Sequence, residues 1–535
     1  MKLKVFLFFF IWTFLLRGQR EGMPYYRVYK PSEYQGHRQN WAITQDSTGT
    51  MHFANEGLLS FDGENWQLNP VPNQRHLRSL DSGHGRVYAG GNDELGYFEK
   101  IQGTYAFTSL AHHVPDSLKS FDRVWTTKVH EDAVFFQTDT FVLRISKDGQ
   151  SRLWPFLENN VWKLLKVNNQ IHIDVPKKGF HRLNEKDEFE LIPNGENLKW
   201  VGMEFFIPTG QGWLVEQTDT LKIFDGERLE TFNHEASEIL TEFGVDNGMK
   251  TKEGLLVFTM RKKGGVVVLN EQGKLLYHFK KDNGFSNELV RNLYEDKEGS
   301  IWFALNSGVS RMEMTSPLRF YGENLGLDGT VFAIQRFQGK LYAGTSTGLK
   351  VLTDTGFEYV QEITALIKDL KVVQNQLIIA TSRDELYAMD SSGKIAVIDD
   401  SKTGSKGITL EILPLKEDAS SMAILFETGI FQVKRVDGKW NVLEHLNGIF
   451  GDAEHFVQAR PGEFWVHTGV RGVFRIQYNQ HPDGTLNLAE AIVTNYQEEK
   501  GIPKGIIALG VAGKSIFIQS QNNASFQKFN PEKDR

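Results

Sequence analysis

Cysteine is absent from the 535 residues of this chain. The absence excludes structural disulfides, thiolate metal sites and a cysteine nucleophile. Packing, hydrogen bonds and the remaining side chains must therefore hold the fold together and supply any chemistry.

The chain also lacks an excess of positive charge and any long amphipathic helical pattern. Lys plus Arg number 60 and Asp plus Glu number 67, which gives a net charge of −7. Binding to nucleic acid needs a basic face, so no nucleic-acid partner is expected. The 50 Gly and 12% aromatic residues instead suit many short strands joined by turns.

Only one long apolar run exists, and it lies at the start of the chain. Lys2 and Lys4 precede residues 5–16, which are apolar except for Thr13. The run is too short for a comfortable membrane span and suits the core of a signal peptide. We predict a signal peptide over residues 1–18, cleaved after Gly18; an uncleaved segment would tether the protein to the membrane.

The clearest pattern in the sequence is the segment 282–312, DNGFSNELVRNLYEDKEGSIWFALNSGVSRM. An apolar alternation leads to a turn at Asp296 and Gly299, then to an aromatic strand around Trp302, then to a second turn at Gly308. Short strands separated by Asp/Gly turns predict a small antiparallel sheet. One such sheet is marginal alone in water, so copies of it are expected.

Copies recur along the chain. A close copy covers residues 46–62, and weaker copies begin at Arg86, Lys340 and Glu463. Their spacing gives a period of about 40 residues with three or four short strands per repeat, which is typical of β-propeller blades.

Two series of units can be counted. The central strands of the first series are predicted at 51–54, 87–91, 134–137, 171–175, 213–216, 255–258 and 301–304. Those of the second series are predicted at 341–344, 377–381, 422–426, 464–468 and 516–519. We therefore predict an all-β fold of tandem β-propellers. Residues 19–314 form the first, seven-bladed propeller, and residues 315–535 form a second with about five visible blades, which is incomplete or smaller.

Ring closure can also be predicted. The aromatic segment 25–34 has no partner in its own repeat, so residues 25–29 are expected to supply the outer strand of the seventh blade. An incomplete second ring should expose the apolar face of its last blade, near residues 516–518, and the matching face of the blade at Leu341.

The best repeat has a wider resemblance. Its matching residues are Asn287, Val290, Leu293, Asp296, Gly299, Trp302, Ala304, Gly308 and Val309. This pattern resembles the repeat of the two-component regulator propeller family, the periplasmic sensor domains of hybrid histidine kinases and related three-tyrosine-motif regulators. Residues 316–321 (SPLRFY) resemble the join between two successive propellers of that family.

The resemblance implies a periplasmic ectodomain that binds a saccharide or another small polar ligand and has no catalysis of its own. It also implies a membrane-linked signalling partner or a C-terminal output domain. A three-tyrosine sandwich, a membrane span and a transmitter follow the propellers in that family, and the sequence shows none of them. We therefore expect a truncated form of a larger sensor. A homodimer is possible.

Candidate site residues emerge when the units are aligned. Each blade is expected to present one residue to the propeller mouth, at the start of its innermost strand. In the first propeller these residues are Trp41, Arg78, Trp125, Trp162, Glu204, Asn247 and Arg291. In the second they are Phe332, Lys368, Leu413, His455 and Ile507. Aromatic faces interleaved with cationic and polar groups suit a sugar, although the same side chains could simply pack between blades.

Other chemistry finds little support. The turn at Asp296, echoed at Asp46, resembles the Asp-box hairpin of sialidases, in which the carboxylate caps backbone N–H groups. The pair His112-His113 lacks a third ligand, so no metal and no cofactor are expected. Two alternatives to a sensor stay open: a protein-interaction scaffold and, less favoured, a propeller-fold glycan lyase or hydrolase.

Overall fold

The computed structural model describes residues 22–72, 76–156, 163–175, 177–198, 205–281, 285, 289–383, 385–398, 407–448, 452–469, 471–496, 506–512, 515–520 and 523–529. The predicted signal peptide therefore lies outside the described residues. Contacts between Cα atoms divide the chain into two compact units, Met23–Phe320 (the first unit) and one that contains Tyr321–Arg535 (the second unit).

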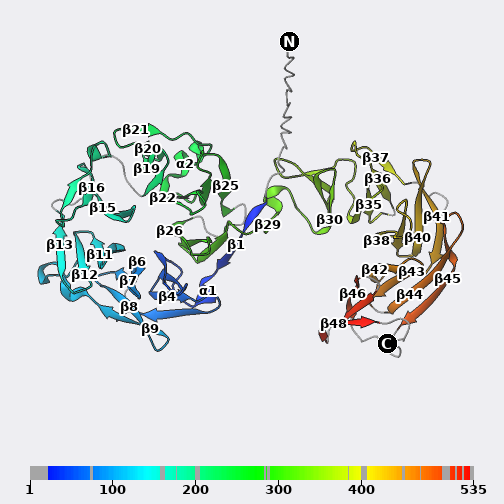
Figure 1. Ribbon diagram of the computed structural model, residues 1–535, viewed down its shortest axis with the longest axis horizontal. Helices are drawn as coiled ribbons and strands as arrows, with labels where there is room; N and C mark the ends of the chain where they lie inside the picture. Colours follow the sequence, from blue (N-terminus) through cyan, green and yellow to red (C-terminus); the bar gives the residue numbers. More distant parts are fainter. Residues whose placement is uncertain are drawn as a thin grey trace, which may run out of the picture. The chain divides into compact units, whose positions relative to one another are not determined.

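The fold is all-β and built from propeller sheets, as predicted. Within its described residues the first unit holds seven antiparallel sheets. The innermost strands are β2 (Ile43–Gln45), β6 (Leu77–Gly83), β10 (Val124–His130), β14 (Lys163–Val167), β18 (Phe206–Thr209), β22 (Val245–Lys250) and β26 (Val290–Glu295). Each of these strands contacts the next, and β26 contacts β2, so the sheets form a ring (Figure 1).

The second strands of the sheets are β3 (Met51–Ala54), β7 (Arg86–Gly91), β11 (Ala133–Thr138), β15 (Gln170–Val175), β19 (Gly212–Gln217), β23 (Leu256–Met260) and β27 (Ile301–Leu305). The third strands are β4 (Gly57–Phe61), β8 (Leu95–Ile101), β12 (Phe141–Ser146), β16 (Gly179–Leu183), β20 (Thr220–Phe224), β24 (Val266–Leu269) and β28 (Val309–Glu313). The outer strands are β5 (Trp66–Pro70), β9 (Thr104–Ser109), β13 (Ser151–Pro155), β17 (Phe189–Leu191), β21 (Leu229–Thr231) and β25 (Leu275–Phe279). The helices α1 (Pro31–Tyr34) and α2 (Ser237–Phe243) lie in connections.

The seventh sheet takes its outer strand from the start of the chain. Strand β1 (Met23–Tyr29) pairs antiparallel with β28, with Tyr25 opposite Glu313 and Tyr29 opposite Val309. Strand β29 (Arg319–Phe320) then pairs with β1, which extends this sheet to five strands. The predicted closure by residues 25–29 is confirmed.

Aromatic packing secures the same joint. Tyr29 is 3% exposed, and its ring lies 5.9 Å from that of Trp302 in a stacked arrangement. It also meets Phe61 at 5.3 Å and Trp66 at 5.2 Å, which belong to the first sheet. One hydrophobic core thus joins the first and last sheets of the ring.

The two best-matched turns are held by their aspartates. In the seventh sheet, Asp296 accepts the Ser300 N–H at 2.8 Å and the Trp302 indole N–H at 2.8 Å. In the first sheet, Asp46 accepts the Thr48 and Thr50 N–H groups at 2.9 and 3.1 Å. The capping role predicted for these carboxylates is confirmed.

The second unit repeats the pattern in five sheets within its described residues. Its inner strands are β30 (Val331–Phe337), β34 (Ile367–Val373), β38 (Thr409–Pro414), β42 (Ala453–Arg460) and β46 (Ile506–Ala512). Its second strands are β31 (Lys340–Thr345), β35 (Gln376–Thr381), β39 (Ser421–Phe426), β43 (Glu463–Thr468) and β47 (Ser515–Ser520). Outside these lie β32 (Gly348–Leu352), β36 (Leu386–Met389), β40 (Gly429–Val436), β44 (Gly472–Gln480), β48 (Asn523–Phe529), β33 (Phe357–Tyr359), β37 (Ile395–Val397), β41 (Lys439–Asn447) and β45 (Leu486–Tyr496).

The expected exposure of the last sheet of the second unit is wrong. Ile516 and Ile518 are 1% and 2% exposed, because they pack into a core with Trp465 of the preceding sheet. The matching face expected at the blade of Leu341 does expose apolar side chains: on its inner strand β30, Phe332 is 45% and Ile334 is 61% exposed.

Candidate functional site: the central cavity of the first unit

The inner strands share a local irregularity that positions the candidate site. On β6, Leu77 lies opposite Gly91 and Ser79 lies opposite Gly90, so Arg78 is an extra residue without a partner. Such a β-bulge bends the strand and changes the direction of a side chain. The same bulge recurs at the start of every inner strand whose first residues are described.

The bulge residues are Arg78, Trp125, Asp246 and Arg291 in the first unit and Phe332, Lys368, Leu410, Glu454 and Ile507 in the second. Trp41 holds the same place in the first sheet: its N–H donates to Ala54 O at 3.0 Å, while the Ala54 N–H donates to Ala42 O at 2.9 Å. The residues predicted from the repeat alignment are thus largely the bulge residues.

Three predicted positions differ from the bulge. The bulge residue of β22 is Asp246, while Asn247 pairs normally with Thr259. In the second unit, Leu413 and His455 pair within their strands, and Leu410 and Glu454 take the bulge position. The predicted residues Trp162 and Glu204 lie outside the described residues.

The bulges of the first unit surround one cavity of about 500 Å³. Its walls come from all seven inner strands, and the lining includes Trp41, Arg78, Trp125, Asn247 and Arg291. Five of the seven predicted residues are therefore brought together. The lining also includes Lys128, Lys163, Lys166, Asp81 and Asp246, which the alignment missed. The alignment considered one position per strand, whereas residues further along each inner strand line the same cavity.

Arginines gather around the tryptophans of the cavity. The guanidinium carbons of Arg78 and Arg291 lie 4.0 and 4.9 Å from the centroid of the Trp41 ring. Arg123 lies 4.7 Å from the centroid of Trp125. Cation–π contacts at these distances are favourable and hold flat groups face to face.

Trp125 is fixed by a carboxylate. Its indole N–H donates to Asp139 Oδ1 at 2.7 Å, and Arg123 Nε donates to Asp139 Oδ2 at 3.2 Å. Asp122 lies 3.3 Å from the same Arg123 nitrogen. The charge of Arg123 is therefore balanced by two carboxylates.

Arg78 and Arg291 are different. Among the described residues neither has a carboxylate within ion-pair distance; Arg291 donates to the amide oxygen of Asn306 at 3.3 Å, and the Nε of Arg78 is buried without a hydrogen-bond partner. Burial lowers the pKa of Arg78, and the charges of Arg123 and Arg291 lower it further, against the opposing effect of Asp122. A half-buried guanidinium with an unsatisfied Nε and other cations nearby favours an anionic group.

The acidic side chain of Asp81 is already occupied. Its two carboxylate oxygens accept the N–H groups of Ser82 at 2.9 Å and Val129 at 2.7 Å. The second of these bonds links neighbouring inner strands, so Asp81 serves the ring rather than a ligand.

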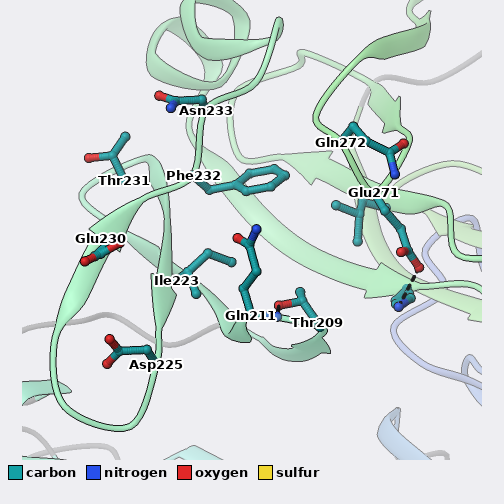
Figure 2. A pocket seen from close by; sticks show the side chains of 13 residues that line it. Thr209, Gln211, Ile223, Asp225, Glu230, Thr231, Phe232, Asn233, Glu271 and Gln272 are labelled. Carbon is teal, nitrogen blue, oxygen red and sulfur yellow. Dashed lines mark hydrogen bonds and ion pairs between the residues drawn. The ribbon is translucent and has the colours of Figure 1, made fainter.

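A larger pocket, of about 790 Å³, lies between the fifth and sixth sheets (Figure 2). Its lining side chains Asp225, Glu230 and Glu271 are exposed, and its cation Lys250 already pairs with Glu271 at 2.7 Å. It therefore offers a ligand only one part-buried aromatic ring, Phe232, and no unpaired cation. We assign the candidate site to the central cavity on this chemistry rather than on size.

No candidate metal group includes the pair His112-His113. The two rings lie 4.2 Å apart in a short 3₁₀ turn, and no third ligand atom lies within reach among the described residues.

Comparisons with known proteins identify the fold. No family model matches the sequence, and a search of curated proteins finds no match. The structure is similar to the extracellular domain of BT3049 from B. thetaiotaomicron, described as a hybrid two-component system, with a TM-score of 0.63 and 14% identity over 95% of this chain and 73% of that one. The shared fold is consistent with the two-component regulator propeller family to which the repeat is similar.

Two further solved structures are more distant. The extracellular domain of BT4673, also from B. thetaiotaomicron, has a TM-score of 0.42 and 15% identity over 96% of this chain and 79% of that one. Virginiamycin B lyase from Staphylococcus aureus has a TM-score of 0.27 and 13% identity over 52% and 92%. None of the helices in the described part of the chain is both long and apolar enough to span a lipid bilayer.

Proposed function

We propose that this protein is a periplasmic ligand-sensing ectodomain whose first unit binds an acidic saccharide in its central cavity. The observation that carries the proposal is the half-buried Arg78 side chain beside Trp41 and Arg291, whose buried Nε has no hydrogen-bond partner among the described residues. Sugars stack their C–H faces on indole rings, and guanidinium groups hold carboxylates or sulfates in bidentate fashion. The cavity volume of about 500 Å³ lies within the range of small-molecule sites.

The same arrangement supports binding without catalysis. The described cavity lining holds two carboxylates, Asp81 and Asp246, and Asp81 is a poor general base because both its oxygens accept backbone N–H groups. The distant fold likeness to a lyase adds no catalytic residue. A glycan lyase or hydrolase is therefore the less favoured alternative, and a pure protein-interaction scaffold would leave the unpaired arginine without purpose.

Signalling follows from the fold shared with an extracellular domain of a two-component system. In this proposal the chain is exported and reports ligand occupancy to a membrane-linked partner or output domain. A ring of sheets joined at their inner strands suits that task, because a ligand that contacts several inner strands at once stiffens the whole ring.

Paired variants test the site. Isothermal titration of the purified chain with a uronate-containing disaccharide should show binding, and a neutral disaccharide of the same size should bind at least about tenfold more weakly. Arg78→Ala should abolish most of this preference, whereas Arg86→Ala should not, because Arg86 lies outside the cavity over Tyr97. Failure of both sugars to bind would contradict the proposal.

Stability separates a ligand site from a packing role. Trp125→Ala should weaken the disaccharide about tenfold or more with little change in melting temperature, since its ring faces the cavity. Trp154→Ala on β13 is the matched control: Trp154 also lies under an arginine, Arg152, but packs against the core between two sheets. It should lower stability and leave binding intact. A large loss of stability for Trp125→Ala with unchanged binding would show that Trp125 packs between the sheets and does not bind the ligand.

A further inference from the structure

Two histidines lie side by side on adjacent strands of the fourth sheet of the second unit. His455 on β42 and His467 on β43 are direct cross-strand partners, and their rings lie 5.9 Å apart and nearly parallel. The strands run side by side in Figure 1. Directly opposed residues of an antiparallel pair have their Cβ atoms close together, so both imidazoles reach one point.

The bulge adds a carboxylate to this pair. Successive residues of a regular strand point to opposite faces, which would separate Glu454 from His455. The register shifts between Ala453 and His455, so Glu454 is the extra residue and its side chain is redirected. Its Oε2 lies 3.5 Å from Nδ1 of His467, and one ligand atom from each of the three residues lies within 4.8 Å of the others.

The surroundings leave this cluster available. His467 is 2% exposed, and its Nδ1 has no hydrogen-bond partner. A buried ring nitrogen without a hydrogen bond needs an explanation, and a metal ion shared with the Glu454 carboxylate 3.5 Å away supplies one. Arg471 hydrogen-bonds to Asp452 and is thereby neutralised. At Gly469 a Cβ atom would lie 2.9 Å from Oε1 of Glu454, so the glycine makes room for the carboxylate.

We propose that Glu454, His455 and His467 form a binding site for a divalent transition-metal ion of the Zn²⁺ class. Two imidazoles and one carboxylate are a known zinc ligand set that leaves the fourth position open. Bonds of about 2.0–2.1 Å place tetrahedral ligand atoms about 3.3 Å apart. The Glu454–His467 distance already fits, and a rotation of the half-buried His455 closes the rest. Ca²⁺ and Mg²⁺ prefer all-oxygen sites and do not fit this set.

The position of the site suggests what the open coordination position would bind. Glu454 occupies in β42 the bulge position that Phe332 and Lys368 occupy in β30 and β34. Because the three protein ligands leave the fourth position open, a metal held there would accept an oxygen donor such as a hydroxyl or carboxylate. This inference does not depend on the saccharide site of the first unit.

Calorimetry with the metal alone tests the site. The full chain, first stripped with EDTA and then dialysed, should bind one Zn²⁺ per chain at micromolar concentration or tighter, and Co²⁺ should give the visible absorption bands of a four-coordinate site. His455→Ala and Glu454→Gln should each weaken binding by at least about tenfold. His445→Ala is the matched control, because His445 stacks on Phe431 in the neighbouring sheet.

The outcomes decide the assignment. One Zn²⁺ per chain, lost in His455→Ala and retained in His445→Ala, supports it. Absence of stoichiometric binding, or equal affinity in the parent and in His455→Ala, overturns it. The buried His467 is not needed for the decision: if His467→Ala fails to fold, the half-exposed His455 and the exposed Glu454 still separate the outcomes.

Discussion

The joint between the ends of the first unit offers the sharpest test of the fold. Tyr29→Ala removes a ring that is 3% exposed and that contacts Trp302, Phe61 and Trp66. Truncation of a buried aromatic side chain to Ala costs about 3–5 kcal/mol. A large domain loses about 2–4 °C of melting temperature per kcal/mol, so the first unit should melt about 6–20 °C lower.

A variant on the same strand supplies the control. Tyr25 pairs with Glu313 in the same ladder, but it is half-buried, and its ring lies 5.3 Å from that of Phe320, which is itself 50% exposed. Tyr25→Ala should therefore cost about 1 kcal/mol or less. Differential scanning calorimetry of the full chain measures both variants. Equal losses for the two, or a Tyr29→Ala melt within 1–2 °C of the parent, about the calorimetric error, would refute the assigned joint.

Three further variants test other parts of the structure. Asp296→Ala should lower the free energy of unfolding by about 2–4 kcal/mol, because it leaves the Trp302 indole N–H and the Ser300 N–H without an acceptor. Asp62→Ala, at an exposed turn, should lower it by under about 1 kcal/mol. Urea unfolding measures both variants. Burial raises the pKa of Glu411 to about 7. The folded protein therefore favours the protonated form of Glu411. The free energy of unfolding is highest below the pKa of the unfolded chain and falls by about 3 kcal/mol in all as the pH rises through 7. Glu411→Gln should stabilise the chain at pH 8 and not at pH 4; an equal effect at both values would contradict the assignment.

The central strands were predictable because a strand that is buried on both faces gives a clear run of apolar residues in the sequence. Residues of β3, β11, β23 and β27 are buried without exception, since neighbouring sheets cover both sides. Outer strands such as β13 contain exposed and half-buried residues and no fully buried one, and they give a weaker signal. The sequence pattern therefore identified each sheet by its middle.

The candidate site was predictable only to within a residue or so. The alignment found Arg78, Trp125 and Arg291 at the bulge, but it chose Asn247 where the extra residue is Asp246. Side-chain type does not reveal which residue a strand leaves unpaired, because that depends on the register with the next strand. For the same reason the Glu454 carboxylate could not be placed beside the two histidines from sequence: adjacent residues are expected on opposite faces.

The bulge explains how one frame can carry two kinds of chemistry. An extra residue makes no ladder pair, so its side chain can change without loss of the sheet's cross-strand contacts. In the first unit this position holds Trp125, Arg78 and Arg291 around one cavity. In the second unit it holds Glu454 beside a cross-strand histidine pair. On β6, substitution of the bulge residue Arg78 should accordingly change ligand binding with a small effect on stability, whereas substitution of the next residue, Ser79, should do the reverse. Ser79→Val is the comparison to make with Arg78→Ala, since the buried Ser79 hydroxyl bonds to Val124 O at 3.0 Å and Thr127 Oγ1 at 2.7 Å. If Arg78→Ala proved the more destabilising of the two, the bulge would be a structural joint and not a place for ligands.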